Sequence, residues 1–252
     1  MKNLKSKILS EITIGSWITL SDPAVSEILI RAGFDWLAID MEHSSLSFEQ
    51  AQQHIRVIDL MGKASFVRVM ENNPELIKRF MDAGAYGVIV PLVNCKEDAK
   101  NAVDAVKYPP IGKRGVGLSR AQKYSLDLKS YARWNKEQSI VIVQIEHIKA
   151  VENLSEILSV EGVDGLMIGL YDLSGSLGIP GDFDNYELIE AYNEIIKKAS
   201  QLKKLIGQHV VSIEYSEVTK KLKNGIKFIG FGVDFLFLSE FTKNCLKNIK
   251  QK

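Results

Sequence analysis

Short apolar runs rich in β-branched residues alternate along this chain with longer segments of helical spacing, and the alternation occurs eight times. This pattern is typical of βα units built around a parallel sheet. The predicted strands span residues 12–20, 34–40, 65–69, 86–92, 140–146, 165–169, 205–211 and 227–232. A segment predicted to be helical follows each strand.

Turn and capping residues support this division. The glycines at the expected helix ends are Gly33, Gly84, Gly162 and Gly225. Glycine is favoured there because it adopts the left-handed conformation that ends a helix. Asn73-Pro74 marks a helix start, since asparagine caps the first turn and proline suits its first position.

Eight βα units in about 250 residues match the usual size of a (β/α)8 barrel, the TIM barrel, whereas a doubly wound sheet of this length more often has fewer strands. No linker or break in composition divides residues 1–252, so we expect one α/β domain. Enzymes with this fold carry their chemistry on the loops that follow the carboxyl ends of the strands. The candidate site residues should therefore lie there.

Charge and composition restrict the partners. The chain has 32 Lys and Arg residues against 31 Asp and Glu residues, so it lacks the basic field of proteins that bind nucleic acid or anionic membranes. It contains no apolar run near the roughly 18 residues of a membrane span. Two distant cysteines, Cys95 and Cys245, form neither a disulfide framework nor a zinc pattern. We expect a cytoplasmic protein with a small-molecule partner.

Two carboxylates end neighbouring predicted strands. Glu146 closes the fifth strand and Asp172 follows the sixth. Carboxylate oxygens suit Mg²⁺, Mn²⁺ or Co²⁺ better than a structural zinc ion. Each residue taken alone fits a helix cap or an ion pair equally well, so it is the pair that favours a divalent cation.

Arg68 lies at the carboxyl end of the third predicted strand, and His43 follows the end of the second. Arg68 presents a two-pronged donor to a carboxylate or a developing enolate, or else forms a structural ion pair with Glu42 or Glu146. His43 is a candidate general base because its ordinary pKa lies near neutrality. Asp40, Glu42 or another carboxylate would orient it.

Two further observations concern the mouth of the barrel. His209, on the seventh strand, either lines the mouth or is hydrogen-bonded within the barrel. No lysine stands at the carboxyl end of a predicted strand, which disfavours a Schiff-base mechanism. Electrophilic activation is therefore expected from the metal. His54 and His147 are assigned structural roles.

Five segments together resemble the HpcH/HpaI aldolases, which are metal-dependent enzymes that cleave 2-keto-3-deoxy acids into pyruvate and an aldehyde. The segments are residues 39–43 (IDMEH), 67–69 (VRV), 108–117 (YPPIGKRGVG), 143–146 (VQIE) and 168–174 (IGLYDLS). They follow one another in the same order over nearly the whole chain. The resemblance implies a (β/α)8 barrel with a keto acid and an aldehyde as its small-molecule partners.

By the same resemblance, Glu146 and Asp172 are the metal ligands and His43 is the base that removes the proton from the substrate's 4-hydroxyl. Arg68 stabilises the pyruvate enolate left by cleavage of the carbon–carbon bond. Rival activities are oxaloacetate decarboxylation, another keto-acid lyase reaction, or a barrel that binds ligands without catalysis. A barrel that only binds ligands would have no reason to keep all four of these residues, so their presence argues against it. They are His43, Arg68, Glu146 and Asp172.

The substrate contacts follow in the same way. Gln144 and the backbone at Tyr171 and Asp172 are expected to hold the pyruvate part. Tyr171 stands where many family members have a small residue, and His209 replaces a residue that is often apolar. Both changes concern the aldehyde end of the substrate.

The resemblance also implies assembly. Asp82 is suggested as the carboxylate that raises the basicity of His43, but the strand prediction puts Asp82 on the opposite side of the barrel. Either a neighbouring subunit supplies Asp82 or Asp40 takes its place. A homo-oligomer, trimer or hexamer, is expected, with the last helix exchanged between subunits through residues 235–238 and with Arg114 near an interface.

Overall fold

Eight parallel strands form a closed barrel in chain order, with β1 paired to both β2 and β8. The computed structural model describes residues 4–250. The strands are β1 (Thr13–Ile18), β2 (Trp36–Asp40), β3 (Ala64–Arg68), β4 (Gly87–Val90), β5 (Ile140–Ile145), β6 (Gly165–Ile168), β7 (Leu205–Val210) and β8 (Phe228–Val233). The predicted single α/β barrel is confirmed.

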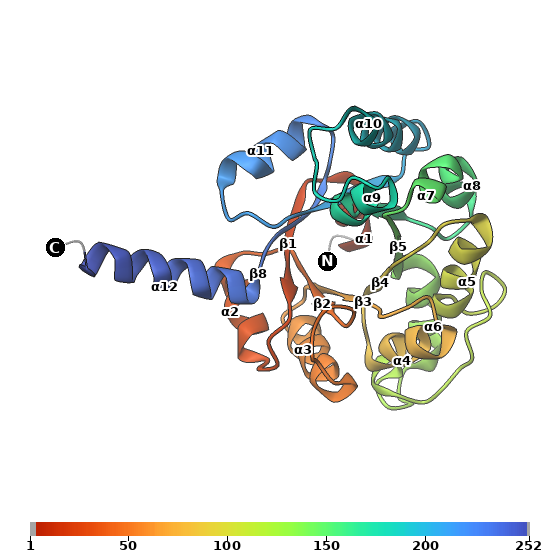
Figure 1. The fold of residues 1–252 in the computed structure, drawn as a ribbon. Helices are drawn as coiled ribbons and strands as arrows, with labels where there is room; N and C mark the ends of the chain where they lie inside the picture. The colour runs from red at the N-terminus through yellow and green to blue at the C-terminus, as the bar shows by residue number, and fades with distance from the viewer. Residues whose placement is uncertain (1–3, 251–252) are drawn as a thin grey trace.

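Helices surround the barrel (Figure 1). They are α1 (Leu4–Ser10), α2 (Ala24–Ala32), α3 (Phe48–Leu60), α4 (Pro74–Ala83), α5 (Lys96–Val106), α6 (Leu128–Gln138), α7 (Ile148–Glu152), α8 (Leu154–Ser159), α9 (Leu170–Ser176), α10 (Tyr186–Gln201), α11 (Tyr215–Lys223) and α12 (Asp234–Lys250), with a short 3-10 turn η1 (Arg120–Gln122) before α6. Residues 4–250 contain no helix that is both long and apolar enough to span a membrane.

The expected helix signals lie where they were predicted. Asn73 caps α4, its side chain accepting a hydrogen bond from the Glu75 amide at 2.9 Å, and Pro74 opens the helix. Gly33 and Gly84 end α2 and α4 with φ of 114° and 100°. A residue with a Cβ would be strained in that conformation.

Strand limits differ from prediction by one or two residues. The first strand ends at Ile18 rather than at residue 20, because the amides of Thr19 and Leu20 each donate to a carboxylate oxygen of Asp234 at 2.8 Å. A side chain distant in sequence thus replaces the sheet hydrogen bonds at this point, and an apolar pattern alone does not reveal it.

Aromatic rings fill the inside of the barrel. Trp36 stacks on Phe228 with ring centroids 3.9 Å apart, and Phe66 meets both rings edge-on. Gly15 makes room for this layer, since a Cβ there would lie 2.0 Å from the Trp36 ring. The barrel is therefore a packed core with no open channel.

Helix α1 packs on the amino end of the barrel. Ile8 is buried in the same cluster as the interior aromatic rings. Lys5 pairs with Asp164 and Lys7 with Asp35, each at 2.6 Å. The carboxyl end is left for the functional site.

Candidate active site

The carboxyl end of the barrel is organised around an ion pair between adjacent strands. Asp40 ends β2 and Arg68 ends β3, and the two residues are partners in the strand register. Arg68 Nε donates to Asp40 Oδ1 at 2.9 Å and Arg68 Nη2 to Asp40 Oδ2 at 2.5 Å. This two-pronged geometry fixes the plane of the guanidinium. Of the two partners that the sequence suggests for Arg68, Glu42 lies within ion-pair distance of it, and Asp40 is a closer partner that was not predicted.

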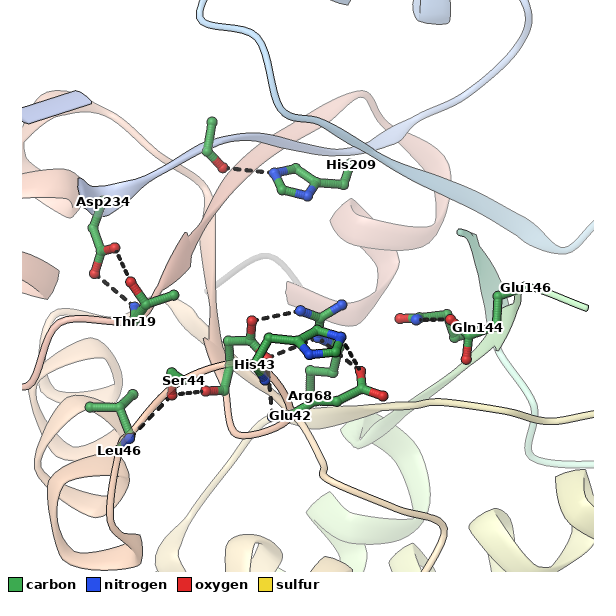
Figure 2. A network of polar contacts seen from close by, with 12 residues as sticks. Thr19, Glu42, His43, Ser44, Leu46, Arg68, Gln144, Glu146, His209 and Asp234 are labelled. Atoms are coloured by element: carbon green, nitrogen blue, oxygen red, sulfur yellow. Dashed lines mark hydrogen bonds and ion pairs between the residues drawn. The ribbon is translucent and has the colours of Figure 1, made fainter. Parts of the chain in front are cut away.

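Asp40 also shapes the loop that carries His43. Its Oδ1 accepts hydrogen bonds from the amides of Glu42 and His43, both at 3.1 Å. The imidazole itself is 66% exposed, and its Nε2 lies 3.7 Å from Glu42 Oε2. Asp40 therefore holds the backbone of His43. The carboxylate beside the ring is that of Glu42 (Figure 2).

Glu42 connects the base to the rest of the cluster. Its Oε2 lies 3.4 Å from Arg68 Nε and is buried without a hydrogen-bond partner. Burial raises the pKa of this carboxyl and the negative charge of Glu146 adds to the effect, while Arg68 opposes it. Negative charge is therefore concentrated between β2 and β5, where a cation would be stabilised.

Glu146 is held in one orientation. It follows β5 and is 5% exposed. Its Oε1 accepts the Leu92 amide at 2.6 Å, and its Oε2 accepts the side-chain amide of Gln144. Gly169 provides the space, because a Cβ there would lie 3.1 Å from Glu146 Oε2. Gln144 Oε1 is buried with no hydrogen-bond partner.

Asp172 lies in the first turn of α9 and is exposed. Its carboxylate makes no hydrogen bond or ion pair with residues 4–250. It lines the same cavity as Arg68 and Gln144. The alternative in which Asp172 serves as a helix cap or ion-pair partner thus has no contact to support it, and the carboxylate is free for a ligand.

The donor set fits a hard divalent cation. Within residues 4–250 no group of three or more His, Cys, Asp or Glu residues is arranged to hold a metal ion. Asp172 and Gln144 line the cavity, and the buried Oε1 of Gln144 is unpaired. Glu146 lies beside Gln144, and each of its carboxylate oxygens already accepts a hydrogen bond. A site with few protein ligands is typical of Mg²⁺, which keeps several positions for water and substrate.

His209 lines the cavity from strand β7. Its Nε2 is 3.0 Å from the Gly232 carbonyl oxygen, and its ring lies 5.2 Å from that of Trp17. Arg68 sits over the same Trp17 ring at 4.5 Å. Burial lowers the pKa of His209 to about 4, with a smaller contribution from Arg68. The imidazole is thus neutral at pH 7, and both sequence interpretations hold, because His209 is hydrogen-bonded in the barrel and lines the cavity.

The cavity has a volume of about 660 Å³ and continues from the barrel mouth to α10 and α11. Tyr171 and Phe183 form part of its wall, with ring centroids 6.3 Å apart. Sequence reasoning missed Trp17, Tyr192 and Lys221. Strand alternation could have placed Trp17 inside the barrel, but no local signal brings a residue of α11 to the mouth.

The remaining titratable residues take other places. Asp82, at the end of α4, pairs with the buried guanidinium of Arg114, whose Nη1 donates to the Tyr131 hydroxyl at 3.0 Å. Within one chain Asp82 is not brought to His43. His54 is hydrogen-bonded to Ser26 at 2.8 Å, and His147 caps α7, as expected for structural histidines.

Comparison with known proteins gives one consistent result. The family model of the HpcH/HpaI aldolase/citrate lyase family matches residues 13–240. The chain is 38% identical over 191 residues to 5-keto-4-deoxy-D-glucarate aldolase of Escherichia coli (strain SMS-3-5), covering 75% of this chain and 74% of the relative.

Solved structures are similar along almost their whole length. The HpcH/HpaI aldolase from Desulfitobacterium hafniense superposes with a TM-score of 0.92 at 28% identity, covering 99% of this chain and 97% of that one. Protein CitE from Mycobacterium tuberculosis, in complex with magnesium and acetoacetate, shares the fold with a TM-score of 0.61 at 13% identity, covering 90% and 87%.

Proposed function

Because this chain belongs to the HpcH/HpaI aldolase/citrate lyase family and is a carbon–carbon lyase, we propose that it cleaves a 4-hydroxy-2-oxo acid, reversibly, into pyruvate and an aldehyde with the aid of a divalent cation. The observation that carries the proposal is the Asp40–Arg68 ion pair, which presents a fixed guanidinium to the cavity that Gln144 and Asp172 also line.

Glu146 and Asp172 are the proposed ligands of Mg²⁺, Mn²⁺ or Co²⁺. When bound, such an ion polarises the carbonyl of a 2-oxo acid. Support comes from the donor chemistry, which consists of oxygens alone, and from the buried Oε1 of Gln144 that lacks a partner. Gln144 and the backbone at Tyr171 and Asp172 would orient the pyruvate part.

The protein side chains divide the remaining work. His43 takes the proton of the 4-hydroxyl as the C3–C4 bond breaks, and the electron pair moves into the pyruvate part as an enolate. Arg68 faces that developing charge with a guanidinium that Asp40 keeps in place. Protonation of the enolate carbon then gives pyruvate.

The direct test is release of pyruvate from synthetic 2-keto-3-deoxy acids, followed chromatographically, with and without EDTA. The proposal expects pyruvate and an aldehyde in equal amounts, with loss of turnover on chelation. The relative's name makes 5-keto-4-deoxy-D-glucarate the first substrate to assay. Absence of cleavage across a panel of such acids with added metal would contradict the proposal.

We further propose that the active enzyme is a homo-oligomer, a trimer or hexamer, that exchanges α12. This helix projects from the barrel (Figure 1). It carries exposed large apolar side chains, namely Phe235, Leu238, Phe241, Leu246 and Ile249. Contiguous apolar exposure of this kind usually marks an interface. A neighbouring subunit is also the one source from which Asp82 would reach His43.

A further inference from the structure

The loop after β4 holds Leu92 in an unfavourable backbone conformation. Its φ is 53°, in the left-handed region, although the residue carries a side chain. A residue other than glycine is strained there, because its Cβ comes too close to the following carbonyl oxygen. The side chain is 60% exposed, so its burial does not explain the conformation. Strain of this kind persists where the surrounding structure fixes it, and it is most common at functional sites.

The backbone amide of Leu92 is directed at the end of the neighbouring strand. Strands β4 and β5 pair in parallel up to Val90 and Val143. Two residues beyond Val90, the Leu92 amide donates to Oε1 of Glu146 at 2.6 Å. The other oxygen of Glu146 accepts the side-chain amide of Gln144. Because a carboxylate with a donor on each oxygen is fixed in its plane, the Leu92 amide sets the direction of the lone pairs that remain for a ligand.

Contacts beyond Leu92 hold the loop in place. Val93 is fully buried in the hydrophobic core. Asp98 Oδ2 accepts the Asn94 amide at 2.9 Å. Asn153, between α7 and α8, donates its side-chain amide to the Asn94 carbonyl oxygen, also at 2.9 Å. These contacts offset the strain and keep Leu92 in a conformation that its own side chain disfavours.

We propose that Leu92 is a positioning residue, whose left-handed backbone aims the amide that holds Glu146 in the orientation needed to bind a divalent cation. This inference rests on the proposed function, in which Glu146 is a ligand of that cation. The backbone conformation of Leu92 carries the effect, and its exposed side chain does not. Substitutions at this position should therefore act according to their tolerance of positive φ, with glycine tolerated best and β-branched residues least.

The test replaces Leu92 by its isomer. Leu92→Ile conserves composition, volume and hydrophobicity but places a branch on Cβ, which makes positive φ less favourable. It should weaken Mn²⁺ binding to metal-free protein by about 10-fold, as measured by the electron paramagnetic resonance signal of the free ion. Leu92→Gly should bind Mn²⁺ at least as tightly as wild type, because glycine adopts this conformation without strain.

Lys203→Ile is the matched control. Lys203 also has φ of 53°, is exposed, and lies in the turn between α10 and β7 at the amino end of the barrel. Both isoleucine variants should lower the free energy of unfolding in urea, but only Leu92→Ile should weaken Mn²⁺ binding. Equal Mn²⁺ affinity in Leu92→Ile and wild type, or an equal loss of affinity in Lys203→Ile, would overturn the inference.

A double-variant cycle tests whether Leu92 acts through Glu146. In the Glu146→Gln background, Leu92→Ile should change the Mn²⁺ affinity by less than about 2-fold, because the carboxylate that the amide orients is gone. A loss as large as the one in the wild-type background would also overturn the inference.

The positioning role and the proposed function fail in different ways. If the Mn²⁺ affinities follow the expected order but no 4-hydroxy-2-oxo acid is cleaved, the positioning role stands and the aldolase proposal fails. If wild type cleaves such acids with metal and Leu92→Ile binds Mn²⁺ as tightly as wild type does, the positioning role alone is refuted.

Discussion

Arg68 and Asp40 face each other across two neighbouring strands, and both nitrogens of the fork are used, at 2.9 and 2.5 Å. The same Asp40 oxygen that receives Arg68 Nε also holds the amides of Glu42 and His43. The Asp40 carboxylate therefore positions two groups. One is the Arg68 guanidinium, which is expected to face the enolate, and the other is the loop that carries His43, the proposed base. Such preorganisation matters because stabilising groups must be in place before charge develops.

Replacing Arg68 tests the role of the guanidinium. Arg68→Ala should lower kcat by about 100- to 1000-fold, the loss typical of one preorganised charge partner. Because this change removes the charge partner of the buried Asp40 carboxylate, Arg68→Lys should be measured beside it, with circular dichroism to verify folding. Arg56→Ala on α3, which removes a surface contact to Gln53, is the control. A near-normal kcat in Arg68→Ala would contradict the assignment.

Replacing His43 tests the base. His43→Gln should slow cleavage by about 100- to 10,000-fold, the range that general base catalysis supplies. The affinity for oxalate, an analogue of the pyruvate enolate, should not change, because His43 acts on the 4-hydroxyl. Ser45→Ala, at an exposed position of the same loop, serves as the control. Equal losses in oxalate binding and turnover would assign His43 to substrate binding.

The pKa of His209 predicts a pH dependence of stability. Its value is lowered from 6.5 to about 4 in the folded protein, so between these pH values the unfolded chain binds more protons. The free energy of unfolding should therefore rise with pH across this window. His209→Gln should reduce that rise, as measured by urea unfolding at pH 4.5 and 7. An NMR titration of His209 with a midpoint near 6.5 would refute the prediction.

Negative charge introduced on the exposed apolar face of α12 should weaken subunit assembly. Leu238→Glu combined with Phe241→Glu should shift the protein to a smaller species in light scattering coupled to size exclusion. Lys247→Glu, which adds negative charge elsewhere on the helix, should leave the mass unchanged. An unaltered mass in the double variant would exclude this face from the subunit interface.

Much of the fold is predictable because it rests on local patterns. Apolar runs that stop at Asp40, Arg68 and Glu146 give the strands and place these polar residues at the same end of the barrel. The pairing of Asp40 with Arg68 was not predicted, since register between strands is decided by contacts distant in sequence. The partner of Asp82 was missed for the same reason, as Arg114 lies 32 residues away.

Lys221 shows a different limit. The expectation that no lysine ends a strand holds, because the strands end in other residues. Yet the cavity extends beyond the strand ends to the wall formed by α11, and Lys221 lines it there. Helical periodicity identifies the buried face of such a helix but not the cavity into which a long side chain reaches.

The central claim is that Glu146 and Asp172 hold the cation on which carbon–carbon cleavage depends. Titration of metal-free protein with Mn²⁺, followed by the electron paramagnetic resonance signal of the free ion, tests it most directly. Wild type should bind about one ion per chain and recover pyruvate release with it, while Glu146→Gln and Asp172→Asn should bind it at least about 10-fold more weakly. Full turnover of metal-free protein in EDTA, or equal Mn²⁺ affinity in all three proteins, would contradict the account.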